Sequence, residues 1–161
     1  MTIKVGDTIP EATLVKATDA GPAPISTAEL FGGRTVALFS VPGAFTPTCS
    51  AKHLPGFVVN ADIIKEHGVD EIVCLSVNDA FVMGAWGKSA DAGDKVTMLA
   101  DGSAVFTTLL GLTMDASKFG MGTRGQRFSM LVKNGVVTHL NIEEPGAFAV
   151  SSAEHMMGQL K

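Results

Sequence analysis

Short apolar runs and segments of helical spacing alternate along the first two thirds of the chain. Thr35–Val41 is a β-branched and apolar run that Pro42-Gly43 ends, which predicts a buried strand. From Thr48 to Glu66 the apolar residues recur at helical spacing, and we expect a helix that ends at Gly68 and is kinked at Pro55. The same criteria predict strands at Glu71–Val77 and Val96–Ala100, and helices at Asp79–Ala90 and Ser103–Leu110.

Turn and capping signals complete the predicted order of elements. Ser26-Thr27-Ala28-Glu29 has the capping-box pattern of a short helix that stops at Gly32-Gly33, and the Pro/Gly-rich patch before it, Gly21–Pro24, is interpreted as a loop. Asn134-Gly135 predicts a hairpin between strands Arg127–Val132 and Val136–Ile142, and Ser152 caps a last helix to Leu160. This order predicts an α/β protein with a thioredoxin-like fold, in which helices flank a mixed central sheet.

Length and charge narrow the classes of function. With 161 residues, we expect one domain over residues 1–161. The formal net charge is −4 and no basic stripe occurs, which argues against nucleic-acid binding. No apolar run approaches the ~20 residues of a membrane span. The first residues show no targeting pattern, so we expect a cytoplasmic protein with reduced thiols, or an organellar one whose targeting peptide was removed.

The chemistry is concentrated in the loop between the strand that ends at Val41 and the helix after it. Thr46 suits the N-cap of that helix and Pro47 its first position, which puts Cys49 at the third. A helix N-terminus stabilises a thiolate by about 0.3–1 kcal/mol, so strong activation needs a second cation. Position alone does not decide between a reactive thiol and a small buried hydrophobe.

The residues around Cys49 carry a resemblance. Pro42-x-x-x-Thr46-x-x-Cys49 matches the active-site pattern of the peroxiredoxins, and the longer run Val41–Cys49 with His53–Phe57 resembles their type II, or peroxiredoxin-5-like, branch. Further similar segments spread over nearly the whole chain: Cys74–Phe81, Trp86-Gly87 and Arg127–Met130.

The resemblance implies a thiol peroxidase that reduces hydrogen peroxide and small alkyl hydroperoxides through a sulfenic acid on Cys49. It also implies that Thr46 orients the peroxide, Pro42 shields the thiolate and Arg127 stabilises it. Some relatives carry a resolving cysteine near the C-terminal helix, but this chain has none after Gly135. The resemblance therefore implies an external thiol as reductant: glutathione, glutaredoxin or thioredoxin. It also implies a second copy of the chain as partner, in a homodimer that buries Phe45 or Trp86. Neither a cofactor nor a metal is implied.

Other residues and motifs of the sequence allow alternative interpretations of the site and of the function. Arg124 and Lys52 could replace Arg127 as the cation. His53 is expected on the helix surface or behind the site, because two Cys/His ligands without a third make a poor metal site. Gly120–Gly125 has the G-x-G-x-x-G spacing, but a strand rather than a helix follows it, so a dinucleotide site is rejected.

A redox sensor or holdase switched by Cys49 is the alternative function, whereas a disulfide reductase lacks its C-x-x-C. Cys74 is expected to be a buried core residue that does not resolve Cys49.

Overall fold

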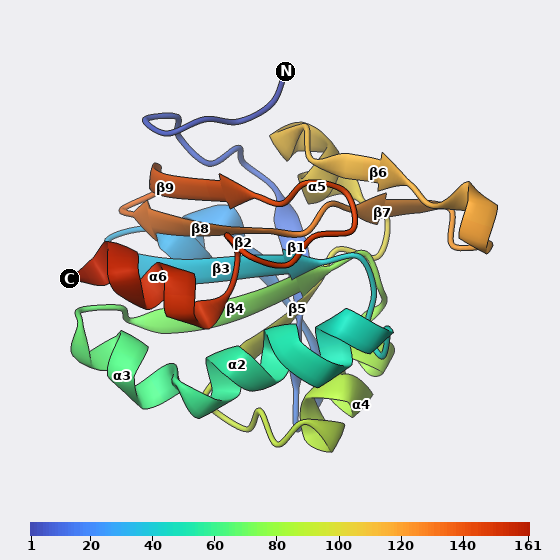
Figure 1. Cartoon of the computed structure of the whole chain (residues 1–161), viewed down its shortest axis with the longest axis horizontal. Helices are drawn as coiled ribbons and strands as arrows, with labels where there is room; N and C mark the ends of the chain where they lie inside the picture. The colour runs from blue at the N-terminus through green and yellow to red at the C-terminus, as the bar shows by residue number, and fades with distance from the viewer.

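The computed structural model describes all 161 residues and has a seven-stranded mixed sheet at its centre (Figure 1). The strand order is β2-β1-β5-β4-β3-β8-β9, with β3, β4 and β5 parallel and the remaining pairs antiparallel. A two-stranded ribbon of β6 and β7 projects from the body. The predicted α/β thioredoxin-like fold with a mixed sheet is confirmed. The elements in chain order are β1 (Thr13–Thr18), β2 (Gly21–Ser26), α1 (Thr27–Phe31), β3 (Thr35–Val41), η1 (Cys49–His53, a π-helical turn), α2 (Leu54–Val59), α3 (Ala61–Glu66), β4 (Glu71–Ser76), α4 (Ala80–Ser89), β5 (Thr97–Ala100), α5 (Val105–Leu110), β6 (Thr113–Asp115), η2 (Ser117–Phe119, a 3-10 turn), β7 (Thr123–Gly125), β8 (Phe128–Lys133), β9 (Val136–Ile142) and α6 (Ala153–Leu160).

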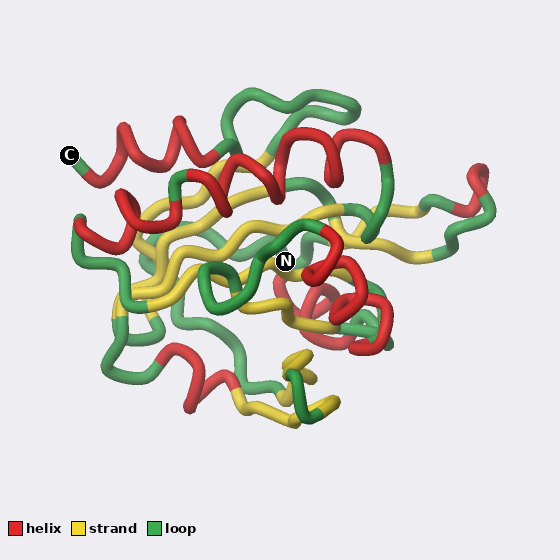
Figure 2. The backbone as a smooth tube through the Cα atoms, turned by 90° about the horizontal axis from the view of Figure 1, so that it is seen from below, coloured by secondary structure: helices red, strands yellow, loops and turns green.

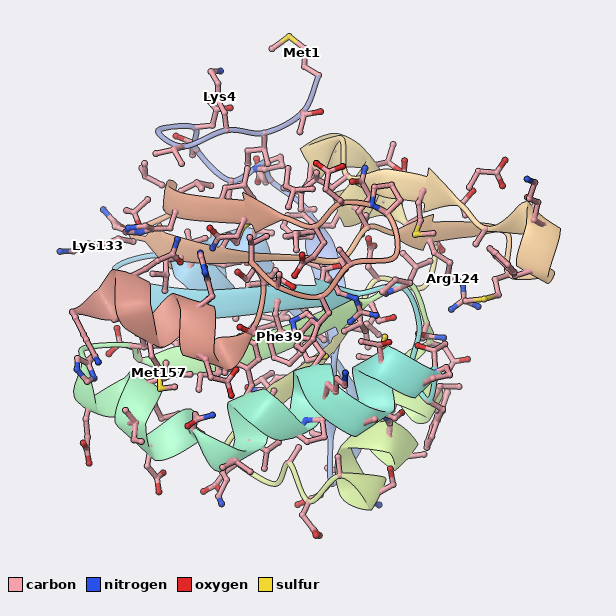
Figure 3. All side chains as sticks on the ribbon, viewed as in Figure 1. Met1, Lys4, Phe39, Arg124, Lys133 and Met157 are labelled. Carbon is pink, nitrogen blue, oxygen red and sulfur yellow. The ribbon has the colours of Figure 1, made fainter.

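Helices cover both faces of the sheet, which gives three layers (Figure 2). Because side chains alternate along a strand, β3 sends Phe39 to one face and Leu38 to the other, and both are fully buried. Phe39 belongs to the core beneath α2, α3, α4 and α6, and Figure 3 shows it between the sheet and α2. Leu38 belongs to the core beneath α1 and α5. Burial on both faces explains why β3 and β4 have nearly continuous apolar sequences.

The local signals of the sequence act as expected at several element ends. Ser26 caps α1 by accepting the Glu29 N–H, and Ser152 caps α6 by accepting the His155 N–H. Asn134 and Gly135 have φ angles of 48° and 76°, the pair of left-handed residues that a type I′ hairpin requires. The hairpin fixes the register of β8, and therefore the position of Arg127, which immediately precedes β8.

Two predictions about the elements are wrong. The patch Gly21–Pro24 is part of β2 rather than a loop, and its prolines are tolerated because β2 is an edge strand that pairs only with β1. The long helix predicted from Thr48 is divided by a break at Asn60, although the distortion expected from Pro55 is present as a π-helical turn just before it. No helix has the length and apolar character required to cross a membrane.

Candidate active site

The loop between β3 and η1 places Cys49 at the start of a helix, as the sequence predicts. Helical geometry begins at Pro47, so Cys49 is the third helical residue. Phe45 adopts a φ of 64°, which is uncommon for a residue with a side chain and marks a sharply turned loop. The Thr46 hydroxyl donates to the Gly43 carbonyl at 2.7 Å and closes this turn instead of capping the helix. The hydroxyl oxygen therefore keeps its acceptor capacity for another group.

The first turn of this helix is wider than an α-helical turn. The Leu54 N–H bonds to the Cys49 carbonyl, five residues back, which is the π-helical pattern. Pro55 explains the widening, because it has no N–H and its ring would collide with the Ala51 carbonyl four residues earlier. Both ends of the π turn, Cys49 and His53, are buried.

The sulfur of Cys49 contacts a guanidinium group. Cys49 has no exposed surface, and the Nη2 of Arg127 donates to its Sγ at 3.1 Å. Arg127 immediately precedes β8, where Phe128 pairs with Ser40 near the end of β3, so the register of the two strands carries Arg127 to the loop that contains Cys49. A permanent cation at this distance favours the thiolate over the neutral thiol.

The two alternative cations do not reach the sulfur. Arg124 donates through Nε to the Met121 carbonyl at 3.0 Å and through Nη1 to the Pro42 carbonyl at 3.4 Å. Arg124 belongs to β7, and Figure 3 shows it beside the ribbon of β6 and β7. Lys52 is exposed on the helix. Of the three candidates, only Arg127 forms a hydrogen bond with Cys49.

His53 lies behind Arg127, so the helix-surface interpretation is wrong and the interpretation of a histidine behind the site holds. The ring has no exposed surface and packs against Phe39 and Phe148, with centroid distances of 4.8 Å and 5.0 Å. Its Nδ1 lies 2.8 Å from Nη1 of Arg127, and its Nε2 lies 2.9 Å from the Ser151 carbonyl oxygen. Burial, followed by the charge of Arg127, lowers the pKa of His53 to about 3.

Sequence reasoning missed Glu143, whose carboxylate contacts Ser151, the partner of His53. Glu143 is buried and accepts from the backbone N–H groups of Ala149 and Ser151 and from the Ser151 hydroxyl, at 2.7–2.8 Å. Burial alone would raise the pKa of Glu143, but these hydrogen bonds to its charged form together lower it. The only signal for His53 is its spacing from Cys49, and nothing in one sequence singles out Glu143.

A cavity of about 650 Å³ adjoins the Arg127 side of the site. Pro42 and Arg127, the two residues assigned to shield and stabilise the sulfur, both line it, whereas Cys49 and Thr46 do not. The cavity thus gives a small molecule access to the immediate neighbours of the sulfur. The lining residues are Pro42, Thr48, Met114, Phe119, Gln126, Arg127, Glu143, Glu144, Pro145, Gly146 and Ala147.

Cys74 is buried in the middle of β4, with Phe39 of β3 as its register partner. Both cysteines are free thiols and belong to the same hydrophobic core. Burial raises the pKa of Cys74 well above its ordinary value, which keeps it protonated. The prediction of a core cysteine in a strand covered on both faces is confirmed.

The aromatic residues differ in their burial. Trp86 is 1% exposed within its own chain, and its indole N–H donates to the Ser50 hydroxyl at 3.0 Å. The expectation that Trp86 could be buried by a second copy is therefore wrong. Phe45 is 53% exposed and Phe81 75% exposed, so neither belongs to the core of its own chain.

The rejected motif and the metal hypothesis can also be placed. The G-x-G-x-x-G segment, Gly120–Gly125, ends in β7 and is followed by strand β8, so no helix follows it, as expected. No group of three or more His, Cys, Asp or Glu side chains lies close enough together to hold a metal ion.

Comparison with known proteins agrees with this geometry. The Redoxin family model matches residues 4–157. The chain is 51% identical over 164 residues to Peroxiredoxin-2E-2, chloroplastic, of Oryza sativa subsp. japonica, which covers 99% of this chain and 73% of the rice protein. It is 46% identical over 159 residues to Peroxiredoxin-2D of Arabidopsis thaliana, with 98% of both chains covered. The structure of reduced Prx3 from Vibrio vulnificus in complex with hydrogen peroxide superposes with a TM-score of 0.95 and 52% identity, over 99% of this chain and 100% of that one.

A thioredoxin-like fold with a cation-paired cysteine at a helix start defines a thiol-dependent redox enzyme. The chain belongs to the Redoxin family and, within it, to the type II peroxiredoxins. It is a thiol peroxidase with Cys49 as its peroxidatic cysteine and a peroxide as its substrate. The predicted family and the predicted thiol peroxidase activity are confirmed.

We expect Arg127→Ala to move the thiolate titration of Cys49 to higher pH. A hydrogen bond to a charged group contributes about 1.5–3 kcal/mol, and Arg127→Ala removes this contribution to the thiolate. The ultraviolet absorbance of the thiolate measures the titration. Lys52→Ala removes a positive charge from the same helical turn without touching the sulfur and serves as the control. An unchanged titration in Arg127→Ala, or an equal shift in Lys52→Ala, would contradict the assignment.

Proposed function

We propose that the contact of Arg127 Nη2 with Cys49 Sγ at 3.1 Å makes this cysteine a fast peroxide-reducing nucleophile. The thiolate attacks one oxygen of the peroxide, the O–O bond breaks, and Cys49 becomes a sulfenic acid. The electron pair of that bond leaves with the other oxygen, which takes a proton to become water or an alcohol. Negative charge moves from sulfur to the leaving oxygen, so the neighbouring guanidinium can stabilise both ends of the reaction.

Thr46 and Pro42 have complementary roles in this proposal. Since the Thr46 hydroxyl already donates to Gly43, its oxygen is suited to accept a hydrogen bond from the O–H of the peroxide and thereby orient it. Pro42 is half-buried and lines the cavity, where it limits the access of water to the sulfur. These roles for Thr46, Pro42 and Arg127 are the ones that the family resemblance implies.

We propose hydrogen peroxide and small alkyl hydroperoxides as substrates. The similar Vibrio protein is described as a complex with hydrogen peroxide. The cavity beside Arg127, at about 650 Å³, is much larger than hydrogen peroxide and includes apolar surface from Met114 and Phe119. It therefore leaves room for an alkyl substituent.

We further propose that an external thiol reduces the sulfenic acid, since Cys74 is buried and protonated in β4 and is the only other cysteine. Glutathione with glutaredoxin, or thioredoxin, would serve as reductant.

Both cysteines are free, so the protein suits a reducing compartment, the cytoplasm or, as in the chloroplastic relative, an organelle. We propose that residues 1–161 act as one domain without a cofactor.

Cys49→Ser is expected to abolish peroxide turnover, because a serine oxygen is far less nucleophilic than a thiolate, whereas Cys74→Ser should retain most of it. Turnover is measured with glutathione, glutaredoxin and thioredoxin supplied separately, which also identifies the reductant. Mass spectrometry after one equivalent of peroxide, without reductant, should find a sulfenic acid or an external thiol adduct on Cys49. A Cys49–Cys74 disulfide as the main product would refute the single-cysteine cycle, and turnover by Cys49→Ser would refute the role of Cys49.

We propose a homodimer in which Phe45 contacts the second copy, because this aromatic side chain lies half exposed on the loop before Cys49. Light scattering of the reduced protein at micromolar concentration should give twice the mass of the chain. Phe45→Asp should give a monomer, whereas Val59→Asp, at an exposed position on α2, should remain dimeric. A monomeric wild-type protein, or a dimeric Phe45→Asp variant, would contradict the proposal.

A further inference from the structure

A continuous series of polar contacts leads from the Cys49 sulfur to the loop between β9 and α6. Arg127 contacts the sulfur through Nη2 and His53 through Nη1, and His53 contacts the Ser151 carbonyl. Ser151 in turn donates its N–H and its hydroxyl to the Glu143 carboxylate. His53 joins the two halves of this series, and the peroxide chemistry described above does not use it.

The partners of His53 determine its protonation state without any assumption about hydrogen positions. A guanidinium can only donate, so Nδ1 of His53 must accept from Arg127. A backbone carbonyl can only accept, so Nε2 must carry the proton that is donated to Ser151. The ring is therefore neutral, in a single tautomer.

We propose that His53 is a positioning residue for the peroxide reaction, which holds Nη1 of Arg127 so that Nη2 points at Cys49. The proposal rests on the stabilising role of Arg127 proposed above. An arginine side chain has many rotamers, and Arg127 borders an open cavity that offers it other orientations. The short contact with a ring that is itself packed between Phe39 and Phe148 selects one of them.

The choice of a neutral acceptor has a chemical consequence. A carboxylate would hold the guanidinium equally well, but it would neutralise the charge that the sulfur needs. Glu143 is close enough to His53 to influence its charge, but its Oε2 accepts from Ala149 and Ser151, and no hydrogen bond joins its carboxylate to Arg127. His53 thus fixes the guanidinium and leaves its positive charge for Cys49.

His53 stays neutral at neutral pH. The charged groups that face the ring are Arg127, which opposes its protonation, and Glu143, which favours it. Burial has the largest effect and, together with Arg127, lowers the pKa of His53 to about 3 against the opposing effects of Ser151 and Glu143. Nδ1 of His53 therefore accepts from Arg127 at neutral pH.

Two substitutions of His53 separate the roles of its two ring nitrogens. In His53→Asn the amide oxygen takes the place of Nδ1, so the acceptor for Arg127 is kept and the contact with Ser151 is lost. In His53→Gln the amide reaches the place of Nε2, so the contact with Ser151 is kept and Arg127 loses its acceptor. Asn also leaves the larger void beside Phe39 and Phe148, so a purely structural role predicts greater damage from Asn than from Gln.

The positioning role predicts the opposite order in the chemistry. We expect His53→Asn to oxidise with peroxide at a rate within about 3-fold of the wild-type protein, and His53→Gln to be about 10- to 100-fold slower, the range expected for a misplaced reacting group. The thiolate titration of His53→Gln should also move to higher pH. The measurements are single-turnover peroxide oxidation of Cys49, the thiolate titration and thermal unfolding of each variant.

Two results would overturn the proposal: rates that follow thermal stability, with Asn slower than Gln, or wild-type rates and titrations in both variants. Should His53→Asn fail to fold, a folded His53→Gln protein with the wild-type titration and rate would overturn it alone. Arg127→Ala in the same assay separates this failure from that of the proposed function. If Arg127→Ala is slow and His53→Gln is not, only the positioning role fails; if Arg127→Ala is also unaffected, the role of Arg127 fails.

Discussion

The hydrogen bond between Arg127 and the sulfur of Cys49 is the constraint on which the site depends. Cys49 is fully buried, and an unpaired thiolate at such a position would be strongly disfavoured by the loss of water. The helix end contributes about 0.3–1 kcal/mol, which is too little to offset that loss alone. A guanidinium at 3.1 Å supplies a charge that no change of pH in the physiological range removes.

The fold brings the two residues together from opposite directions. Cys49 arrives from the C-terminal end of β3 through a loop that Phe45 and Thr46 turn sharply. Arg127 arrives from the start of β8, which runs antiparallel to β3. The register of these neighbouring strands sets the distance between cation and sulfur, so a slip in their pairing would move Arg127 away from Cys49.

How much of this could be predicted depends on the sequence distance between the interacting residues. The strand Thr35–Val41, the capped helices and the Asn134-Gly135 hairpin depend on neighbouring residues, and the structure has them where predicted. The place of Cys49 at the helix start is equally local. Arg127 lies 78 residues from Cys49, and it was singled out only through the family resemblance.

The wrong and missing predictions have the same origin, because they concern contacts between residues far apart in the sequence. The prolines of β2 are acceptable only at the edge of the sheet, and strand order is not a local property. The contact between His53 and Ser151 spans 98 residues, and the anchoring role of Glu143 depends on a loop that folds back onto it. Spacing in one sequence therefore places Cys49 at a helix start, but it does not identify the residues that hold the cation beside it.

The most direct test of the account is a double-mutant cycle between His53 and Arg127, read out as the rate of Cys49 oxidation by peroxide. If His53 acts by holding Arg127, the loss caused by His53→Gln should be present with Arg127 in place and should largely vanish in the Arg127→Ala background. Losses that simply multiply in the double variant would show that the two side chains act independently, and would contradict the account.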